Sequence, residues 1–428
     1  MTKTVGVAGA ANAARGSPAI IRRERCRLCD SNQLEPALSL TATPPANAFT
    51  TSSEAALAQQ RYPLDVHRCG ACGHAQLLDV VDPAALFEDY VYVSGTSPAF
   101  VAHLEAYAGR AIDTVGLVAG DHVLEIGSND GTLLGFFKNA GMRVTGVDPA
   151  RAIAESASAS SIPTINGFFT ESLARDIAAQ HGPAKLVCAN NVCAHIDNLA
   201  AVVRAVSACL SGDGQFWLEV SYLLDVVDKG LFDTIYHEHL DYHRVEPLVR
   251  FFARHDLCVW DVERIASHGG SIRVKVCRAG ARQVTPAVGQ CVAAEQAARL
   301  HLAEGFASWQ ARIDALGLAL GEKLHELTGA GLRGAGYGAP AKATTLMFQF
   351  GLDASSIEYI VDDSPWKQGL YSPGIGLPVV AGDYLKSNPA DFLVVLAWNF
   401  ATPIIRNNAW FTERGGRFVV PLPRLEIV

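Results

Sequence analysis

Two glycine-rich turns, each between an apolar run and a helical segment, constrain the fold of this chain more than any other feature. In the first, the apolar residues 122–126 lead into the turn 127–131, and a helix is expected from Thr132. In the second, residues 334–338 open another helix. Strands that alternate with helices in this way form parallel sheets covered by helices. The sequence therefore predicts an α/β protein with two Rossmann-like domains.

The residues of the first turn indicate what it binds. A dinucleotide fingerprint would read Gly-x-Gly-x-x-Gly, whereas this turn places Asn129 between Gly127 and Gly131 and follows Glu125. It is similar to the Glu-x-Gly-x-x-x-Gly motif of class I S-adenosylmethionine-dependent methyltransferases. The next strand ends at Asp148, where a carboxylate can accept hydrogen bonds from ribose hydroxyls. A nicotinamide or flavin site is the alternative.

Two further segments are expected to face the same ligand. A third strand ends at Asn190 and Asn191, at the edge of the sheet where ligands bind. An aromatic and hydroxyl-rich run, residues 87–97, precedes a helix that should begin near Pro98, and this run forms either a linker or a lid. The residues predicted to bind the methyl donor are Tyr92, Glu125, Gly127, Asn129, Gly131, Asp148, Asn190 and Asn191.

Four of the ten cysteines form two Cys-x-x-Cys pairs, Cys26 with Cys29 and Cys69 with Cys72. Each pair can place two thiolates on one tight turn, and two such turns make the tetrahedral four-thiolate site that zinc prefers. Four protein ligands leave no position open for a substrate, so this zinc should be structural. A redox pair or an iron–sulfur site is the alternative, and most of the other cysteines are expected to be buried thiols.

Length and composition limit the number of domains, the kind of ligand and the location that we expect for the protein. With 428 residues the chain is long enough for several domains, which we place at 1–25 (a flexible tail), 26–88 (the zinc-binding module), 89–245 (the methyl-donor domain) and 246–428 (the C-terminal domain). A net charge of −8 argues against general nucleic-acid binding. No apolar run is long enough to cross a bilayer, and the N-terminal segment is a poor signal peptide. We therefore expect a cytoplasmic protein that is a monomer or a weak homo-oligomer.

Residues 236–243, Tyr-His-Glu-His-Leu-Asp-Tyr-His, contain the densest group of proton-carrying side chains. Histidine has a pKa near neutrality and is the usual general base, while tyrosine and carboxylate partners can orient it or stabilise an oxyanion. His239 and His243 would share one face of a helix, which leaves metal binding open. No glutamate follows His239, so the His-Glu-x-x-His protease pattern is absent. A polar helix surface that happens to be rich in histidine is the other alternative.

The order of these features resembles a known enzyme family. A four-cysteine domain, Tyr-x-Tyr-x-Ser-Gly from Tyr90, Glu-Ile-Gly-Ser-Asn-Asp-Gly from Glu125 and Tyr-His-Glu-His from Tyr236 are similar to the sugar C-methyltransferases of deoxysugar and antibiotic biosynthesis. These enzymes place a methyl branch on C3 of nucleotide-linked 4-keto-6-deoxyhexoses. The resemblance covers nearly the whole chain after residue 25, and Tyr-His-Glu-His is its most specific part.

The resemblance implies roles for individual residues. His239 would be the general base, with Tyr236 and Glu238 assisting it and Tyr90 reaching the sugar. S-adenosylmethionine would bind around the first glycine-rich turn, with Asp148 on the ribose. The sugar nucleotide would be dTDP-linked and held largely by the C-terminal domain.

The second glycine-rich turn fits a loose Gly-x-Gly-x-x-Ala pattern, so on its own it could bind a nicotinamide or no ligand at all. Given the resemblance, we expect it to cradle the nucleotide diphosphate, with later strand ends and a Gly/Pro-rich loop on the same face. The residues predicted to bind the substrate are His237, His268, Gly336, Tyr337, Lys342, Lys367, Tyr371 and Asn399.

The chemistry that these residue types support is proton abstraction next to a ketone, followed by methyl transfer to carbon. A histidine can take the C3 proton while a tyrosine or a second histidine stabilises the oxygen on C4. Transfer to a hydroxyl oxygen would need the same base, so an O-methyltransferase is the nearest alternative. An NAD-dependent sugar-nucleotide oxidoreductase and a zinc-bearing scaffold are the others. His243 departs from the aromatic or apolar residue that we expect there.

Overall fold

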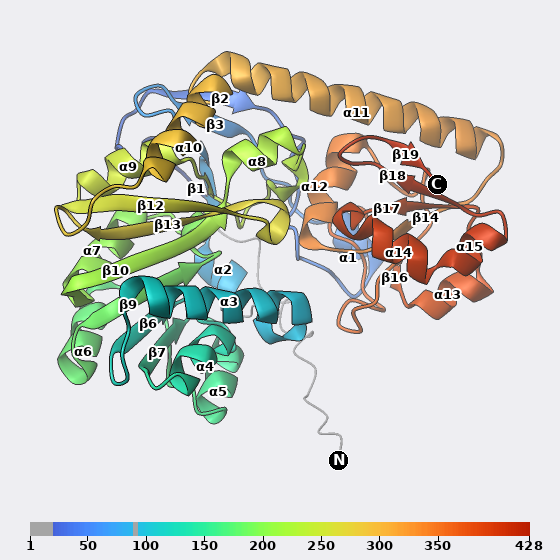
Figure 1. The fold of residues 1–428 in the computed structure, drawn as a ribbon. Helices are drawn as coiled ribbons and strands as arrows, with labels where there is room; N and C mark the ends of the chain where they lie inside the picture. Colours follow the sequence, from blue (N-terminus) through green and yellow to red (C-terminus); the bar gives the residue numbers. More distant parts are fainter. Residues whose placement is uncertain (1–19, 89–92) are drawn as a thin grey trace.

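The computed structural model describes residues 20–88 and 93–428, which form two lobes joined by a long helix (Figure 1). The left-hand lobe in that view contains a seven-stranded sheet, and the right-hand lobe contains a six-stranded sheet. Helix α11 (Ala303–Gly329) runs across the top of both lobes. Neither α11 nor any other helix of the described ranges has the length and apolar character needed to cross a bilayer. The predicted α/β architecture with an N-terminal zinc-binding module is confirmed.

The N-terminal module is a four-stranded antiparallel sheet, and one of its strands comes from far along the chain. Strands β2 (Leu34–Leu38), β3 (Val66–Cys69) and β4 (Ala75–Leu77) are neighbours in sequence order. Strand β11 (Asp241–Tyr242), which directly follows the Tyr-His-Glu-His segment, pairs with β4. The segment with the densest group of histidines is thus attached to the zinc-binding module.

A second, two-stranded sheet extends the module toward the N-terminus. Strand β1 (Ile20–Arg22) pairs antiparallel with β5 (Asp79–Val81), so residues 20–22 are structured although we expected them in the flexible tail. Residues 1–19 of the expected tail lie outside the described residues. The module also contains the short helices α1 (Ser53–Leu57) and α2 (Pro83–Phe87).

The seven-stranded sheet has the order β12-β13-β10-β9-β6-β7-β8. Its parallel strands are β6 (His122–Ile126), β7 (Arg143–Asp148), β8 (Thr164–Asn166), β9 (Ala184–Asn190) and β10 (Leu210–Ser221). Helix α3 (Pro98–Val115) precedes these strands, and the helices between them are α4 (Thr132–Asn139), α5 (Arg151–Ala159), α6 (Glu171–His181) and α7 (Leu199–Cys209). Val123 and Trp217 pack in one core with residues of α3 and α4, whereas Leu124 and Phe216 pack in another with residues of α6 and α7. The sheet is therefore buried on both faces, as parallel sheets usually are.

The division that we expected at residue 245 cuts through this sheet. Beyond it, α9 (Val245–Ala253) leads to β12 (Leu257–Ile265) and β13 (Ser271–Arg278), which return antiparallel to the edge strand β10. The pairing of β13 with β10 extends from Gln215 to Ser221, so the edge of the methyl-donor sheet is covered only when both strands are present. The sheet ends at Arg278, and the C-terminal domain follows.

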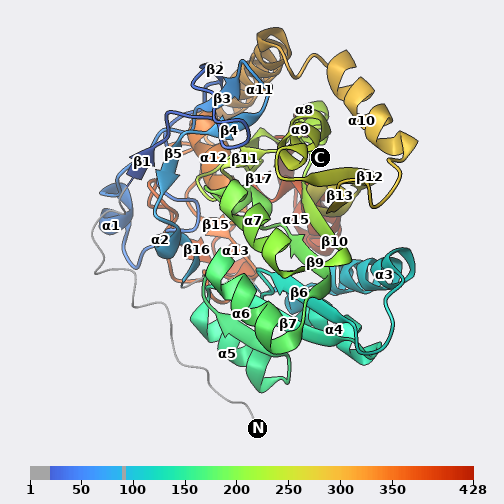
Figure 2. The same ribbon diagram turned by 90° about the vertical axis from the view of Figure 1, so that its left-hand side faces the viewer.

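The C-terminal domain begins with two helices, α10 (Pro286–Ala297) and α11. Its sheet has the order β16-β15-β14-β17-β18-β19, parallel except for β19. The strands are β14 (Gly334–Tyr337), β15 (Ile360–Val361), β16 (Val379–Val380), β17 (Phe392–Val395), β18 (Arg417–Val420) and β19 (Glu426–Ile427). The helices are α12 (Ala341–Phe350), α13 (Gly382–Ser387), α14 (Ala401–Asn407) and α15 (Ala409–Glu413). Figure 2, turned by 90°, shows α10 and α11 at the top of the molecule, above the seven-stranded sheet.

A buried ion pair holds the three parts together. The Glu295 carboxylate on α10 accepts hydrogen bonds from the backbone N–H groups of Val245 (2.6 Å) and Glu246 (3.1 Å) at the start of α9. It also lies 3.5 Å from the Arg244 guanidinium, and both side chains are fully buried. The same guanidinium donates to the carbonyl of Gly73, beside the second cysteine pair, at 2.7 Å. One charge pair therefore links α10, α9 and the zinc-binding module.

Replacing Glu295 with Gln should lower the free energy of unfolding by about 3 kcal/mol, because the buried Arg244 guanidinium would lose its nearer and fully buried carboxylate partner and keep only Glu246, at 3.9 Å. The measurement is the denaturant midpoint, compared between wild type and variant. Glu304→Gln, at the exposed pair with Arg299, is the matched control and should unfold like wild type. An effect of Glu295→Gln no larger than that of the control would contradict this role of the ion pair.

Candidate active site

The first glycine-rich turn requires glycine at two positions. Gly127 has φ +67°, and a Cβ there would lie 2.3 Å from Cγ2 of Val192. Gly131 has φ +77°, and a Cβ there would lie 2.7 Å from Cγ2 of Ile162. Both the backbone conformation and the contacts exclude a larger residue. Glycine at both positions therefore lets the chain turn sharply from β6 into α4 at the carboxyl end of the strand, the edge at which ligands bind in such sheets.

The carboxylate of Asp148, at the end of β7, holds this turn in place. One oxygen accepts a hydrogen bond from the backbone N–H of Asn129 at 2.8 Å, and the other accepts from the N–H of Ala150 at 2.9 Å. Burial raises the pKa of Asp148 above its usual value although both backbone bonds act in the other direction. Since a carboxylate oxygen can accept two hydrogen bonds, Asp148 can also bind ribose hydroxyls.

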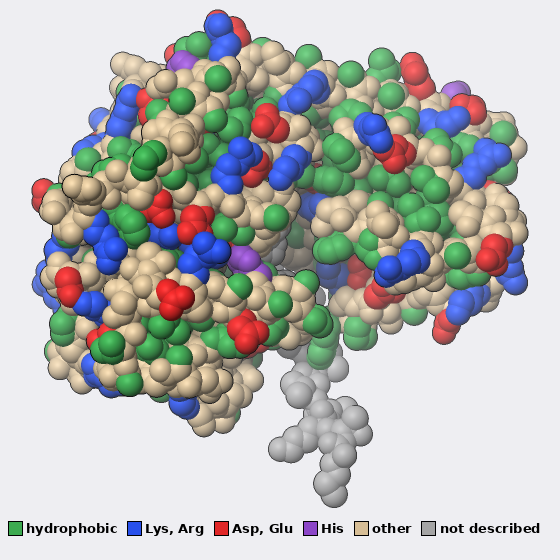
Figure 3. All heavy atoms as spheres, viewed as in Figure 1, with side chains coloured by type: hydrophobic (Ala, Val, Ile, Leu, Met, Phe, Trp, Pro, Cys, Tyr) green, Lys and Arg blue, Asp and Glu red, His purple; other side chains and the backbone are tan. Residues whose placement is uncertain are grey.

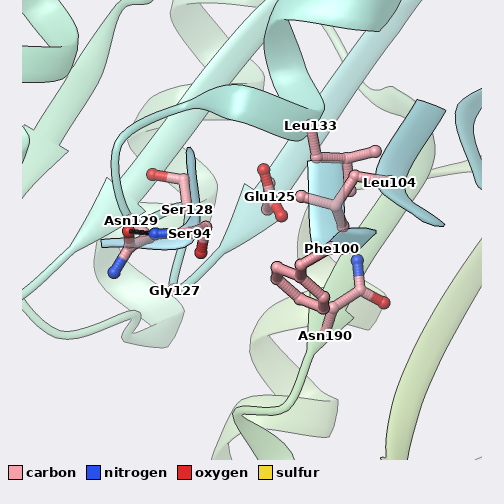
Figure 4. A pocket seen from close by; sticks show the side chains of 9 residues that line it. All are labelled: Ser94, Phe100, Leu104, Glu125, Gly127, Ser128, Asn129, Leu133 and Asn190. Carbon is pink, nitrogen blue, oxygen red and sulfur yellow. Dashed lines mark hydrogen bonds between the residues drawn. The ribbon is translucent and has the colours of Figure 1, made fainter. Parts of the chain in front are cut away.

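A small cavity lies beside the turn, at the carboxyl ends of β6 and β9 (Figure 4). It is lined by Ser94, Phe100, Leu104, Glu125, Gly127, Ser128, Asn129, Leu133 and Asn190. Oε2 of Glu125 and both amide atoms of Asn190 are buried and find no hydrogen-bond partner among the described residues. Burial raises the pKa of Glu125 well above its usual value. Buried polar groups in proteins are normally paired, so these atoms fit a polar ligand such as S-adenosylmethionine.

The segment that enters α3 is tied to the same turn. The backbone N–H of Ser94 donates to Oδ1 of Asn129 at 2.9 Å (Figure 4). That of Gly95 donates to Oδ2 of Asp130 at 2.9 Å. The predicted site residues Tyr90 and Tyr92, just before it, lie outside the described residues. Asn191, the other predicted residue at the end of β9, has φ +55° and donates its backbone N–H to the carbonyl of Glu219 at 2.7 Å.

The four predicted zinc ligands lie together. The sulfur atoms of Cys26, Cys29, Cys69 and Cys72 all lie within 4.8 Å of one another, and two of the separations are 3.7 and 3.4 Å. Tetrahedral zinc with Zn–S bonds of about 2.3 Å would place its sulfur ligands roughly 3.8 Å apart. The cluster therefore has the composition and size of a structural zinc site.

The Tyr-His-Glu-His segment is a loop between the 3₁₀ turn Phe232–Thr234 and β11, not a helix. His239 and His243 therefore do not share a helix face, and the ring of His243 is fully buried against that of His74. Among the described residues, the only group of histidine, cysteine or acidic side chains that could hold a metal is the cysteine cluster. The hypotheses of a histidine metal site and of a polar helix surface are both wrong.

Within this loop, Tyr236 and His239 are partly exposed, whereas His237 and Glu238 are buried. Nδ1 of His239 lies 2.6 Å from the carbonyl oxygen of Thr234. A carbonyl can only accept, so Nδ1 carries the proton and the neutral ring has its basic lone pair on Nε2. The ring of His239 lies 4.1 Å from that of Tyr236, measured between centroids. His239 is partly exposed and thus has the tautomer that a general base acting through Nε2 requires.

His195, which follows β9, lies beside His239. Its ring lies 5.0 Å from that of His239, and its Nδ1 donates to the carbonyl of Glu238 at 2.7 Å. Burial lowers its pKa, so the ring is neutral near pH 7. We assigned it no role from the sequence. Its place at a ligand-facing strand end was the available signal.

The two buried members of the loop contact the zinc-binding module. Glu238 accepts a hydrogen bond from the side chain of Asn47 at 2.9 Å, and burial raises its pKa to about 7. Nε2 of His237 lies 3.3 Å from the carbonyl of Tyr62, and burial lowers its pKa to about 4. Glu238 can therefore be a neutral acid near pH 7, while His237 donates to the backbone of the module.

Helix α12, which the second glycine-rich turn opens, approaches the loop from the other lobe. The hydroxyl of Thr345 donates to the carbonyl of Ile235 at 2.7 Å, and that of Thr344 donates to the carbonyl of Ala46 at 3.0 Å. Nζ of Lys342 lies 3.6 Å from the Asp233 carboxylate. The N-terminal end of α12 therefore lies against the candidate catalytic loop and the zinc-binding module at once.

The structure places the other predicted substrate residues around the same edge of the six-stranded sheet. Gly336 is buried within β14 and Tyr337 ends that strand, while Asn399 is exposed after β17. Nζ of Lys367 donates to the carbonyl of Ala339 at 2.7 Å, and Tyr371 pairs with Thr50 of the zinc-binding module. The side chain of His268 lies outside the described part of the structure. Figure 3 shows that the surface is hollowed between the two lobes.

Comparisons with known families cover each part of the chain. Residues 26–87 match the family described as "Putative zinc binding domain" and residues 100–262 match "Methyltransferase domain". Residues 266–423 match "C-methyltransferase C-terminal domain". Together these matches span the zinc-binding module, most of the seven-stranded sheet and the C-terminal domain.

Individual proteins show similarity over different lengths. The chain is 35% identical over 406 residues to the C-methyltransferase NovU of Streptomyces niveus, across 95% of this chain and 97% of that protein. Magnesium protoporphyrin IX methyltransferase from Synechocystis PCC 6803, solved with bound SAH, is 13% identical, with a TM-score of 0.33 over 42% of this chain and 83% of that one. The PH0226 protein from Pyrococcus horikoshii is 13% identical, with a TM-score of 0.36 over 44% and 94% of the two chains.

Removing the zinc should destabilise the whole catalytic loop, because β4 of the zinc-binding module pairs with β11. We expect Cys29→Ser to reduce the metal content below about one zinc per chain and the melting temperature by more than about 10 °C. Metal analysis and a thermal scan provide the measurement. Cys258→Ser, at a half-buried cysteine outside the cluster, is the control and should keep the zinc. A zinc-free Cys29 variant that melts like wild type would contradict the structural role.

Proposed function

This chain belongs to the family of S-adenosylmethionine-dependent sugar C-methyltransferases, and we propose that it methylates C3 of a dTDP-linked 4-keto-6-deoxyhexose with His239 as the base. The observation that supports this most directly is the hydrogen bond from Nδ1 of His239 to the carbonyl of Thr234, which makes Nε2 the basic atom. The similarity to a C-methyltransferase along 95% of the chain favours a carbon acceptor over a hydroxyl oxygen.

In the proposed reaction, Nε2 of His239 takes the C3 proton of the bound ketone. The electron pair of the C–H bond forms a C3–C4 double bond, and the negative charge develops on the C4 oxygen. Hydrogen-bond donors at that oxygen lower the barrier. Tyr236, 4.1 Å from His239 between ring centroids, and Glu238, with a pKa raised to about 7 by burial, are the proposed assistants.

S-adenosylmethionine supplies a sulfonium-bound methyl group to the nucleophilic C3 carbon and leaves as a neutral thioether. Glu125 and Asn190 would hold it through their buried unpaired atoms, and Asp148 would accept from its ribose. Gly127, with a φ of +67° that other residues rarely adopt, lines the cavity beside these atoms. The carboxyl ends of β6 and β9 would then present the methyl group to the loop that contains His239.

The sugar nucleotide would bind on the C-terminal side of that loop. The N-terminal end of α12 favours negative charge, and Lys342 and Lys367 lie on the same edge of the six-stranded sheet. Thr344 and Thr345 hold this end of the helix against the loop. A diphosphate there would place its sugar toward Tyr236 and His239. None of the ten cysteines forms a disulfide, which is consistent with a reducing compartment, and we propose a cytoplasmic location.

Replacing His239 with Gln should lower kcat by about 10²–10⁴-fold, because a glutamine can hydrogen-bond but cannot take a proton. In heavy water, wild type should introduce deuterium at C3 when the acceptor is a dTDP-4-keto-6-deoxyhexose and methyl transfer is prevented by omitting S-adenosylmethionine. The variant should lose this exchange in the same proportion. His325→Gln, at an exposed histidine on α11, is the matched control. Exchange that survives in the His239 variant, or a methyl group found on oxygen, would contradict the mechanism.

The raised pKa of Glu238 predicts a pH dependence of stability. Its pKa rises from 4.5 to about 7 because burial disfavours the carboxylate. The folded state therefore holds this proton more tightly than the unfolded chain, and the resulting stabilisation is full below pH 4.5 and is lost as the pH rises through about 7. Relative to Glu238→Gln, wild type should lose up to roughly 3 kcal/mol of unfolding free energy across this window. Denaturant unfolding of both proteins at several pH values measures this, and a difference that does not change with pH would contradict the shift.

A further inference from the structure

The residue next to the acceptor of the His239 proton is a buried carboxylate. Asp233 is fully buried and precedes Thr234, whose carbonyl accepts the hydrogen bond from Nδ1 of His239 at 2.6 Å. Both residues belong to the 3₁₀ turn Phe232–Thr234. The orientation of this turn therefore decides whether the Thr234 carbonyl points at the His239 ring.

The partners of Asp233 come from the C-terminal domain. Nε1 of Trp398, which follows β17, donates to Oδ2 of Asp233 at 2.6 Å. Nζ of Lys342 on α12 lies 3.6 Å from the same oxygen and 4.2 Å from the centre of the Trp398 ring. Oδ1 of Asp233 finds no hydrogen-bond partner among the described residues. The carboxylate is thus held from one side, by two groups at the ligand-binding edge of the six-stranded sheet.

Burying a carboxylate destabilises the folded state unless the groups around it hold it in a specific geometry. The neutral imidazole has two tautomers, and in water they interconvert freely. Only the form protonated on Nδ1 leaves Nε2 basic, so a base loses rate in proportion to the population of the other form. Holding the Thr234 carbonyl against Nδ1 selects the productive tautomer.

We propose that Asp233 is a positioning residue for His239, acting through the Thr234 carbonyl, and that Trp398 and Lys342 hold it in place. The proposal rests on the assignment of His239 as the base. Lys342, which we predicted from the sequence to bind phosphate, would then serve the catalytic loop directly. These contacts link the C-terminal domain, which we propose holds the sugar nucleotide, to the protonation of His239.

The test is the tautomer of His239 in ¹⁵N-histidine NMR spectra, with the signal assigned by its loss in His239→Gln. Wild type should show a single neutral form protonated on Nδ1. Asp233→Asn keeps the size of the side chain but removes the charge that pairs with Lys342, and it should shift the ring to a mixture. If nine tenths of the rings adopt the wrong tautomer, kcat falls about tenfold, while KM for both substrates stays within about twofold.

Trp398→Phe tests the other partner of the same hydrogen bond, since it keeps an aromatic ring and removes the donor to Asp233. It should change the tautomer and kcat in the same direction, and it serves as the second test if Asp233→Asn folds poorly. Glu295→Gln is the matched control, because it also neutralises a fully buried carboxylate. It should lower stability while leaving the His239 tautomer and the kcat/KM split as in wild type.

The outcomes separate the two proposals. A His239 signal that keeps its single tautomer in both Asp233→Asn and Trp398→Phe would overturn the positioning role. A shifted tautomer with unchanged kcat would also overturn it, since the base would not depend on Asp233. Full turnover in His239→Gln would instead overturn the assignment of the base, and the NMR result would still show whether Asp233 sets the tautomer.

Discussion

The pairing of β11 with β4 is the interaction on which the arrangement of the active site depends. Immediately after His239, the backbone N–H of Leu240 donates to the carbonyl of Ala194 at 2.7 Å, and its carbonyl accepts from Leu77 at 2.9 Å. Residue 240 is thereby fixed between the methyl-donor domain and the zinc-binding module. At the other end of the loop, Thr345 of α12 holds the carbonyl of Ile235. The four residues between these points are held from all three parts, so their positions depend on how the parts pack and not on local sequence alone.

Buried charges specify this packing. Oδ1 of Asp241 on β11 lies 2.6 Å from Nε2 of His74, and its other oxygen lies 3.9 Å from the guanidinium of Arg27. Burial alone would raise the pKa of Asp241, but Arg27 and His74 outweigh it and lower the pKa. Such a pair adds little net stability compared with an apolar core, because desolvation opposes the attraction. A shift of β11 by one residue would separate these charges in a buried environment, so the pair selects one register.

The sequence predicts elements whose signals are local. The strand 122–126 and the helix from Thr132 were expected at the positions where β6 and α4 lie, because a buried strand, a glycine turn and an amphipathic helix follow one another without a gap. The zinc ligands were predictable for the same reason, since each pair lies on one turn. The contacts of Glu238 with Asn47 and of Asp233 with Trp398 join residues that are 191 and 165 positions apart, and no periodicity reveals them. The boundary expected at residue 245 was wrong because β12 and β13 return to an edge that lies before it.

The environment of the histidines around the loop explains why one of them is suited to take a proton. Burial lowers the pKa of His237 and of His243 to about 4, and it also lowers that of His195. These rings are therefore neutral near pH 7. His239 is partly exposed and lies 5.0 Å from His195, so a charged His195 would oppose the imidazolium that forms when His239 accepts a proton. Neutral neighbours remove that repulsion, and they leave the positive charge to be balanced by the enolate that forms in the same step.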